Sequence, residues 1–375
     1  MDLQDFRKEI DRIDKSLVEL FSERLDISEQ VAQYKIDNDM RVLDAKREKE
    51  KLASVAGMLK DPFRSRSVRE LFEQIMTISR KRQYQLLGEN GVLHGTSFIE
   101  VDSLFHENMR IVYQGAEGSY SELAVKMFFG EDTGAMAVET FRDAMTALEE
   151  GAADYAVLPI ENSTAGIVSE NYDLLSSFEN YIVGEQIVPI RHCLMAPEGA
   201  RMETIQTVYS HPQSLMQSER FLAQHPSWNL ISMKNNAFAA RKVAEDGDVT
   251  QAAVAGENAA RRYGLAVLAE GVNEEEDNST RFIVVSNRKI FRKDAKKISL
   301  CLETVHEAGA LYRVLSHFIF NNLNMTGIES RPIRERSWEY RFFIDFEGNM
   351  NDPAVRNAIR GIREEARSMR VLGNY

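Results

Sequence analysis

Cationic and polar side chains interrupt two apolar rows in the first 88 residues. Arg24 stands in a row of apolar residues that recurs at steps of three and four, and Lys35 follows eleven positions later on nearly the same helical face. Ser79 and Gln83 interrupt a second row in the same way. A cation on an apolar stripe is costly unless an anion meets it. The four positions therefore indicate a cavity for a small anionic ligand, although solvated helix ends would show the same pattern.

A short charged run lies between these two rows. Asp44, Arg47 and Glu48 belong to it, and such a run is usually a solvated helix face. Arg7 precedes Arg24 by seventeen residues, which is about 25 Å of helix. Arg7 could therefore meet the same ligand only from an antiparallel partner chain.

Three polar clusters follow β-rich runs in the middle of the chain. They are Asn162 with Ser163, Ser210 with His211 and Gln213, and Thr280 with Arg281 and Phe282. Proteins that alternate strands and helices place ligands at strand ends of this kind. A glycine-rich run at 114–121 also follows a strand and could hold an anion with its amides. Each cluster alone could be a turn with a helix cap.

Two motifs stand out in the last eighty residues. The first comprises Gly309, Ala310 and Leu311, and the second comprises Glu329, Ser330, Arg331 and Pro332. The first motif opens a helix after a strand, where free amides suit a carboxylate, although an ordinary helix start would look the same. The second combines turn chemistry with a charged pair next to a strand.

The apolar period predicts helices throughout residues 1–88. The seam consists of Phe6, Ile10, Ile13, Leu17, Leu20, Arg24, Ile27, Val31 and Tyr34, at alternating steps of four and three. Asn38 and Asp39 interrupt the period, a second helix opens near Asp44, and Asp61-Pro62 starts a third. Because three helices leave an apolar stripe open, self-association is expected.

Residues 110–287 alternate β-rich runs with helical stretches, after a loop of mixed polarity at 89–109. The predicted strands include 111–113, 155–159, 181–184, 207–209, 252–255 and 281–285. This order predicts an α/β domain long enough for two lobes. Residues 296–375 predict strand 297–305, helix 309–322, a strand pair around 337–338, helix 353–368 and a final strand at 371–372. That βαββαβ order is typical of a small α+β domain.

Composition limits the classes of function. A chain of 375 residues predicts two or three domains. Its formal net charge of −12 argues against nucleic acid or an anionic membrane as the main partner. The sequence has no basic start before an apolar core and no run of about 18 apolar residues, so a cytoplasmic location is expected. Cys193 and Cys301 lack a metal-ligand spacing, and there is no phosphate loop or nicotinamide fingerprint, so we expect no metal or cofactor.

Residues 1–88 resemble the all-helical chorismate mutase family. The resemblance rests on Arg7, Arg24, Lys35, Asp44, Arg47, Glu48, Ser79 and Gln83 at that family's spacing. It implies a pericyclic rearrangement of chorismate to prephenate that needs no nucleophile, metal or cofactor. Arginines would bind two carboxylates, Lys35 and Gln83 would donate to the ether oxygen, and Glu48 would hold the ring hydroxyl. Arg7 would come from the other subunit of an intertwined dimer.

Residues 110–287 resemble prephenate dehydratase, through the three polar clusters and through Ala165-Gly166 and Gly256-Glu257 in the same order. The resemblance implies a two-lobed, periplasmic-binding-protein-like domain that converts prephenate to phenylpyruvate by expelling carbon dioxide and a hydroxyl group. Thr280 would assist the departing hydroxyl. The other cluster residues would line the cleft, although a histidine before proline, such as His211, is more often a structural turn residue.

Residues 296–375 resemble the amino-acid-binding ACT domain of prephenate dehydratases, through the two motifs above and the terminal run 371–375. The whole chain is thus similar to the bifunctional P-protein family of phenylalanine biosynthesis. The resemblance implies chorismate and prephenate as substrates, phenylalanine as a feedback inhibitor bound at 309–311 and 329–332, and a homo-oligomer. A dimer and a tetramer both fit.

Two other interpretations fit parts of the pattern. The helices could serve only as a dimerisation arm for a dehydratase acting on prephenate or arogenate, but such an arm would favour Leu or Ile at Arg24, Ser79 and Gln83. A solute-binding or amino-acid-sensing protein would also combine two lobes with a sensor domain. A sensor, however, would need neither Thr280 nor the cations of the helical segment.

Overall fold

The computed structural model describes residues 2–90, 97–275, 277–333 and 336–375. They form two compact units. The first unit comprises Met1–Thr96 with Leu300–Arg370, and the second comprises Ser97–Ser299 with Val371–Tyr375. Among the described residues, none of the helices combines the length and apolarity needed to span a membrane.

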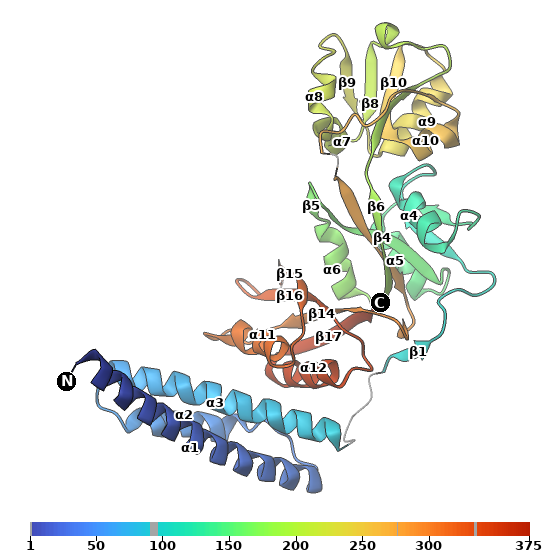
Figure 1. Cartoon of the computed structure of the whole chain (residues 1–375). Coiled ribbons are helices and arrows are strands. Elements are labelled where there is room, and N and C mark those ends of the chain that lie inside the picture. Colours follow the sequence, from blue (N-terminus) through green and yellow to red (C-terminus); the bar gives the residue numbers. More distant parts are fainter. Residues whose placement is uncertain (1, 91–96, 276, 334–335) are drawn as a thin grey trace. The chain divides into compact units, whose positions relative to one another are not determined.

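Three helices begin the first unit (Figure 1, blue). They are α1 (Leu3–Asp37), α2 (Ala45–Gly57) and α3 (Pro62–Glu89). The carboxylates of Asp44 and Asp61 accept the Arg47 and Arg64 amides and cap α2 and α3, and Pro62 occupies the first turn of α3. The three predicted helices and their breaks are therefore confirmed, and α1 and α2 both pack against α3.

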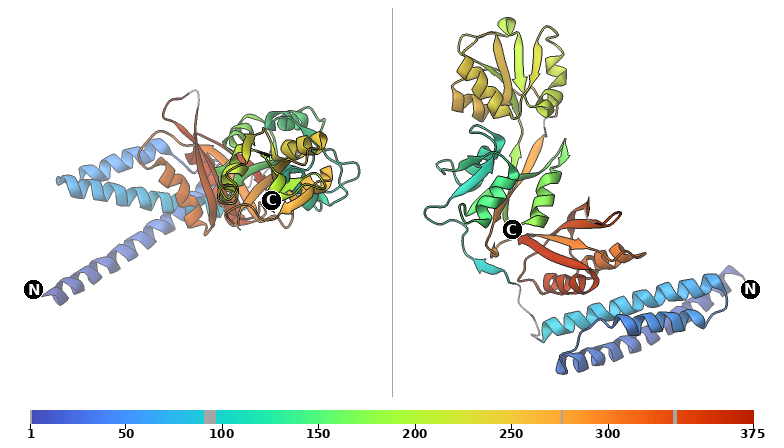
Figure 2. Two further views of the ribbon diagram at one scale, coloured as in Figure 1. Left: turned by 90° about the horizontal axis from the view of Figure 1, so that it is seen from above. Right: turned by 180° about the vertical axis from the view of Figure 1, so that it is seen from behind.

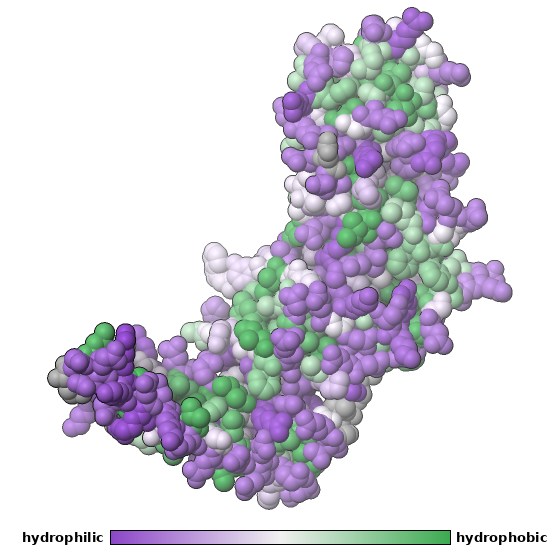
Figure 3. Space-filling view, viewed as in Figure 1, coloured by the Kyte–Doolittle hydropathy of each residue, from purple (hydrophilic) through white to green (hydrophobic). Residues whose placement is uncertain are grey.

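The predicted apolar seam of α1 lies largely on the surface of the chain. Phe6 is 53% exposed, Leu17 53% and Leu20 63%. Figure 2 shows the N-terminal part of α1 diverging from α3, and Figure 3 shows apolar residues at the surface of the helical segment. A row of large apolar side chains that one chain leaves in water is typical of an association surface.

The C-terminal part of this unit has the expected βαββαβ order. Its elements are β14 (Lys297–Glu303), α11 (Ala310–Phe320), β15 (Met325–Pro332), β16 (Tyr340–Glu347), α12 (Pro353–Glu365) and β17 (Ser368–Asn374). The strand order is β15-β16-β14-β17. The two helices pack on each other and on α3, and Phe318 and Phe346 meet edge to face in the core. The segment 329–332 belongs to β15 and is not the predicted turn.

The described part of the second unit contains two large sheets besides a two-stranded one, which confirms the two-lobed α/β prediction (Figure 1). One sheet has the order β17-β6-β12-β4-β2-β3, and the other has the order β11-β7-β10-β8-β9. The strands of the first are β2 (Ile111–Gln114), β3 (Met136–Val138), β4 (Tyr155–Asn162), β6 (Tyr181–Pro189) and β12 (Ser279–Ser286), with β5 (Gly166–Ile167) paired to β4. The strands of the second are β7 (His192–Ala196), β8 (Thr207–Ser210), β9 (Asn229–Ser232), β10 (Gln251–Gly256) and β11 (Ala266–Ala269).

Helices accompany both sheets of the second unit. The first lobe has α4 (Tyr120–Phe129), α5 (Phe141–Glu149) and α6 (Ser169–Ser177), and the second has α7 (Pro212–Gln217), α8 (Glu219–Leu222), α9 (Asn236–Asp246) and α10 (Glu257–Tyr263). Within the segment expected to be a linker, β1 (Ile99–Val101) pairs in parallel with β13 (Ile290–Arg292). Nothing local in 89–109 indicated this strand, because its partner lies almost 200 residues later in the sequence.

Candidate functional sites

The cation of α1 and the polar pair of α3 meet in the helical segment. Arg24 Nη1 donates to Ser79 Oγ at 2.6 Å, and Ser79 is 5% exposed. Burial lowers the pKa of Arg24, and the charge of Glu48 opposes that shift. A half-buried guanidinium beside a hydroxyl is suited to bind a carboxylate.

Lys35 forms the second contact between α1 and α3. Its Nζ donates to Val42 O at 2.5 Å and lies 3.3 Å from Gln83 Oε1, while Gln83 Nε2 donates to Ser28 Oγ at 3.0 Å. Burial lowers the pKa of Lys35, and the charges of Asp44 and Glu48 oppose the shift. The ammonium and the amide of Gln83 therefore stand together, one helical turn beyond Ser79.

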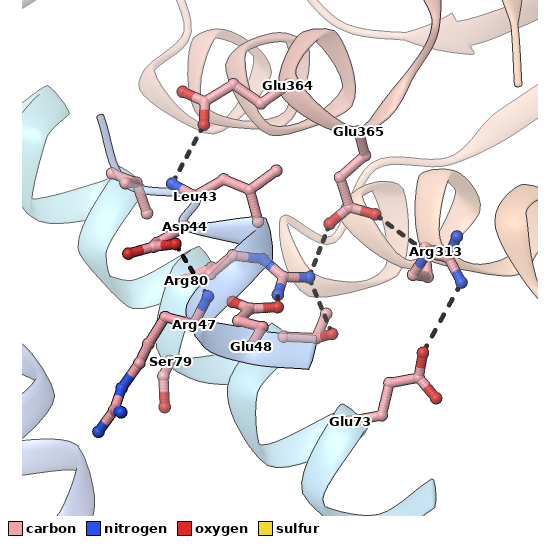
Figure 4. A network of polar contacts seen from close by, with 12 residues as sticks. Leu43, Asp44, Arg47, Glu48, Glu73, Ser79, Arg80, Arg313, Glu364 and Glu365 are labelled. Carbon is pink, nitrogen blue, oxygen red and sulfur yellow. Dashed lines mark hydrogen bonds and ion pairs between the residues drawn. The ribbon is translucent and has the colours of Figure 1, made fainter. Parts of the chain in front are cut away.

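Three further predicted positions lie on or before α2, and one lies far from them. Asp44 caps α2 by accepting the Arg47 amide at 3.0 Å, and the Arg47 side chain extends away from Glu365 (Figure 4). Glu48 accepts a hydrogen bond from Arg80. Arg7 is exposed near the start of α1, and the fold of a single chain does not bring it to the other positions.

In the second unit, Thr280 and Asn162 are opposite each other on β12 and β4. Asn162 Nδ2 donates to Thr280 Oγ1 at 2.9 Å, to Asn278 Oδ1 at 2.8 Å and to Ser279 O at 3.0 Å. Thr280 is 9% exposed. Ser163 Oγ accepts the Ser279 amide at 3.0 Å and so ties the same two strand ends together. Two of the predicted clusters are thus one hydrogen-bonded group.

This group continues across to the second lobe. Gln217 Nε2 donates to Thr164 Oγ1 at 2.8 Å, and Gln217 Oε1 lies 3.1 Å from His192 Nε2. The other ring nitrogen of His192 lies 3.0 Å from the Tyr120 hydroxyl. His192 is 2% exposed, and burial lowers its pKa. The hydrogen bond with Gln217 acts in the opposite direction but is the smaller effect. A neutral imidazole with two polar neighbours is therefore held between the lobes.

The third predicted cluster lies at the end of β8 and the start of α7. Ser210 is fully buried, and its hydroxyl donates to Val254 O at 2.6 Å. His211 caps α7 by accepting the Gln213 amide at 3.3 Å, and burial lowers its pKa. Gln213 lines a cavity of about 140 Å³ together with Thr164, Gln217 and Asn278. The cavity lies between the Asn162 group and α7.

None of Thr280, Arg281 and Phe282 lines this cavity, but Thr280 is linked through Asn162 to Asn278, which does. Arg281 is 17% exposed and pairs with Glu161 at 3.6 Å and with Glu185 at 3.5 Å. Phe282 is 2% exposed and belongs to the hydrophobic core of the first lobe. Strand alternation explains the orientation of Arg281, which faces the other way from Thr280, and the pairing register of β12 with β4 shifts between Arg281 and Phe282. The expectation that Phe282 lines the cleft is corrected: it packs the strand in place.

The two C-terminal motifs lie on different elements. Gly309 precedes α11 with φ +79°, a left-handed conformation that favours glycine, and Ala310 is buried behind it. Along β15, Glu329 and Arg331 are half-buried, whereas Ser330 is exposed. The order β15-β16-β14-β17 leaves β15 at the end of its sheet, where backbone groups can pair with another chain.

Sequence reasoning overlooked Arg80 and His192. A signal for Arg80 was present, since it continues the buried row of Met76, Tyr84 and Leu87 on α3, as Arg24 does on α1. For His192 the sequence shows only one histidine at the start of a strand, and its partners Tyr120 and Gln217 are distant in sequence.

Comparison with known families assigns both regions. The family model of chorismate mutase type II matches residues 6–84, and the family model of prephenate dehydratase matches residues 111–290. A bifunctional chorismate mutase/prephenate dehydratase of Escherichia coli (strain K12) is 33% identical over 98% of this chain and 95% of its own length.

Two solved structures resemble about 71% of the chain. One is a prephenate dehydratase from Arthrobacter aurescens in complex with L-Phe, with a TM-score of 0.66, 28% identity and 89% of that protein covered. The other is a quorum-quenching acylase, with a TM-score of 0.64, 28% identity and 97% covered. Because one fold can carry different reactions, the fold alone does not identify the activity, and the family matches carry that assignment.

Proposed function

Since this chain belongs to the family of bifunctional chorismate mutase/prephenate dehydratases, we propose that its two reactions run on separate sites, one in each compact unit. The chain isomerises chorismate to prephenate and converts prephenate to phenylpyruvate, two steps of phenylalanine biosynthesis. We assign the mutase to 1–88, the linker to 89–109, the dehydratase to 110–287 and a regulatory domain to 296–375. A cytoplasmic location fits this role.

For the mutase, Arg24 and Arg47 bind the two carboxylates of chorismate, and Ser79 keeps the Arg24 guanidinium in place. The Lys35 ammonium and the Gln83 amide donate to the ether oxygen, which gains negative charge as its C–O bond breaks. The ammonium lies 3.3 Å from the amide oxygen of Gln83, which supports this pairing because it places the amide group beside the ammonium. Asp44 contacts the substrate beside them, and Glu48 accepts from the ring hydroxyl.

A second copy of the chain completes this site. The exposed seam of α1 packs against the same seam of the partner, and Arg7 of each chain then reaches the ligand held at Arg24 of the other. Burying large apolar side chains such as Leu17 and Leu20 drives the association, at about 1.5–3 kcal/mol for each side chain fully buried. The active assembly is therefore at least an intertwined dimer.

For the dehydratase, Thr280 donates a proton to the departing hydroxyl group. Its hydroxyl accepts from Asn162, which leaves its own proton free to point into the cleft. Asn162, Ser163 and Gln213 orient the substrate from the strand ends and from α7, and carbon dioxide leaves as the ring becomes aromatic. Ser210 and His211 shape the start of α7, and Arg281 supplies positive charge near β12.

Phenylalanine regulates the chain from residues 296–375, acting as an ACT domain. Its carboxylate meets backbone amides in the first turn of α11, and its ammonium meets Glu329 from the exposed edge of β15. The Arthrobacter relative was crystallised with L-Phe, which supports this effector. Because β15 is an edge strand, the site lies where two copies meet.

One observation carries the mutase assignment: the seam-breaking residues of α1 contact the seam-breaking residues of α3. A pure dimerisation arm would not bury such contacts. Incubating the purified chain with chorismate, while following prephenate and phenylpyruvate separately, tests both activities. We expect prephenate first and phenylpyruvate after it. Unconsumed chorismate with active dehydration would favour the arm interpretation, and faster turnover of arogenate would change the second substrate.

A further inference from the structure

A buried ion cluster joins α3 to α12 within the first compact unit (Figure 4). At its centre the Arg80 side chain is 7% exposed. Its Nη1 donates to Glu48 Oε2, and its Nη2 donates to Glu365 Oε1 at 2.9 Å and to Thr77 Oγ1 at 3.1 Å. Arg80 therefore connects a residue of the mutase site with a residue 285 positions away in the sequence.

Helix α11 holds the far end of this connection. The Glu365 side chain is 6% exposed, and its Oε1 accepts from His317 Nε2 at 3.2 Å. Arg313 Nε lies 3.9 Å from Oε2 of the same carboxylate. Burial by itself would raise the pKa of Glu365. The hydrogen bond from His317 and the charge of Arg80 outweigh the effect of burial, and the pKa is lowered to about 2. The carboxylate is therefore charged at neutral pH.

The position of Arg80 between two carboxylates bears on Glu48. One guanidinium nitrogen fixes Oε2 of Glu48, which leaves Oε1 to accept from a substrate hydroxyl. The other nitrogen is held by Glu365. If the charge of Glu365 is removed, Glu48 is the only carboxylate that Arg80 contacts directly among the described residues. The Arg80 and Glu48 side chains can then shift together from their present positions. A displacement of about 1 Å at a substrate contact can cost about 100-fold in rate.

We propose that Arg80 is a positioning residue of the mutase, which aims Glu48 at the ring hydroxyl of chorismate and is itself anchored by Glu365. This inference rests on the proposed role of Glu48. It means that α12, outside the residues 6–84 that match the mutase family, completes the support of the mutase site.

The test uses the full chain with Glu365→Gln, which keeps the size of the side chain and removes its charge. We expect kcat/KM for chorismate to fall about tenfold, while dehydration of added prephenate stays within about twofold of the parent. Glu303→Gln is the matched control, because the Glu303 side chain is 10% exposed and pairs with Arg336 and Arg341 inside the C-terminal segment. This control should keep the parent mutase activity.

A second variant separates positioning from simple stability. Arg80→Lys keeps the charge, but a single ammonium cannot bridge both carboxylates in the same geometry. We expect a comparable loss of mutase kcat/KM. The double variant Arg80→Lys with Glu365→Gln should have a kcat/KM only slightly below that of the less active single variant. If Glu365→Gln does not fold, as judged by circular dichroism, Arg80→Lys decides by the same criterion.

Three results would overturn the inference: mutase kcat/KM within about twofold of the parent in both folded variants, an equal loss in Glu303→Gln, or losses that multiply in the double variant. A parent chain that does not consume chorismate would instead overturn the proposed function. A parent that is active, with variants that are unaffected, overturns the role of Arg80 and leaves the mutase assignment standing.

Discussion

A hydrogen bond between Arg24 and Ser79 joins α1 to α3 across 55 residues of chain. Ser79 is buried and Arg24 is half-buried, so an anion or a dipole that faces the positive charge stabilises it. At the scale of single residues, the proposed mutase site consists of a few half-buried or buried polar side chains, and each can be tested by substitution.

Arg24→Ala is expected to reduce mutase kcat/KM by about 30- to 1000-fold, because a buried charged contact to a carboxylate is worth about 2–4 kcal/mol. Dehydration of added prephenate should be unchanged. Arg12→Ala serves as the control, since Arg12 is an exposed arginine on the same helix paired with Glu9 at 3.0 Å. Steady-state assays with each substrate check the result, and undiminished chorismate turnover in Arg24→Ala contradicts the assignment.

Thr280→Ala is expected to reduce dehydration by about 100- to 10,000-fold, the usual contribution of a positioned proton donor. Chorismate should still be consumed, so prephenate accumulates. Thr280→Ser keeps the hydroxyl that accepts from Asn162 and should retain part of the activity. Thr280→Val keeps the branched shape in β12 without the hydroxyl and should behave like the alanine variant. Phenylpyruvate formed at the parent rate by the alanine variant would assign the proton to another donor.

At the scale of elements, α1 and α11 carry the surfaces that we propose a second molecule and a ligand contact. Seam residues of α1 are more than half exposed at Leu17 and Leu20, and α11 begins with a glycine in the left-handed conformation. Neither feature lies in a hydrophobic core, so a substitution at either one tests the proposed function of its helix.

Leu17→Lys is expected to dissociate the assembly and to abolish most mutase activity, because a charge enters the apolar seam and Arg7 no longer reaches a partner. Val18→Lys is the control, since Val18 is 68% exposed but lies off the seam on α1. Size-exclusion chromatography with light scattering measures the mass of both. A parent chain that is monomeric at assay concentrations rules out the intertwined dimer.

Gly309→Val is expected to weaken phenylalanine binding while both activities persist, because a branched side chain crowds the amides that receive the carboxylate. At φ +79° it also strains the backbone. Gly309→Asn tolerates this φ better and separates strain from crowding. Calorimetry measures binding in each variant. Full-strength binding to Gly309→Val, with inhibition competitive with prephenate, would place the effector in the dehydratase cleft.

At the scale of the whole molecule, buried ion pairs tie the C-terminal segment to the helical segment inside one compact unit. A carboxyl group whose pKa is lower in the folded than in the unfolded chain stabilises the fold when the pH is above its pKa in the unfolded chain. For Glu365 that contribution is complete above about 4.5 and disappears as pH falls toward about 2.

The difference in unfolding free energy between the parent and Glu365→Gln should therefore be on the order of a few kcal/mol near neutral pH and should shrink as pH falls from about 4.5 toward 2. Denaturant titrations of both proteins between pH 7 and 3 measure it. The variant Glu303→Gln is the control, because it shows how removing another carboxylate of the same segment changes the dependence of stability on pH. A difference that stays constant over this range contradicts an ionised Glu365 in the folded chain.

The sequence by itself determined the three helices, the two-lobed α/β region and the final βαββαβ order. These follow from local physics, because apolar spacing acts over one or two turns and caps such as Asp44 and Asp61 act over three residues. The same reasoning found Arg24, Lys35, Ser79 and Gln83, since each breaks an apolar row, and the structure brings them into contact in pairs. Their chemical roles remain proposals.

Tertiary structure alone decided which distant groups meet. Arg80 pairs with Glu365, and His192 stands between Tyr120 and Gln217, although no local pattern relates these positions. Phe282 turned out to be core. The physical reason is that a long-range contact depends on how whole elements pack and in which register strands pair, and one residue of shift reverses the face that a side chain occupies.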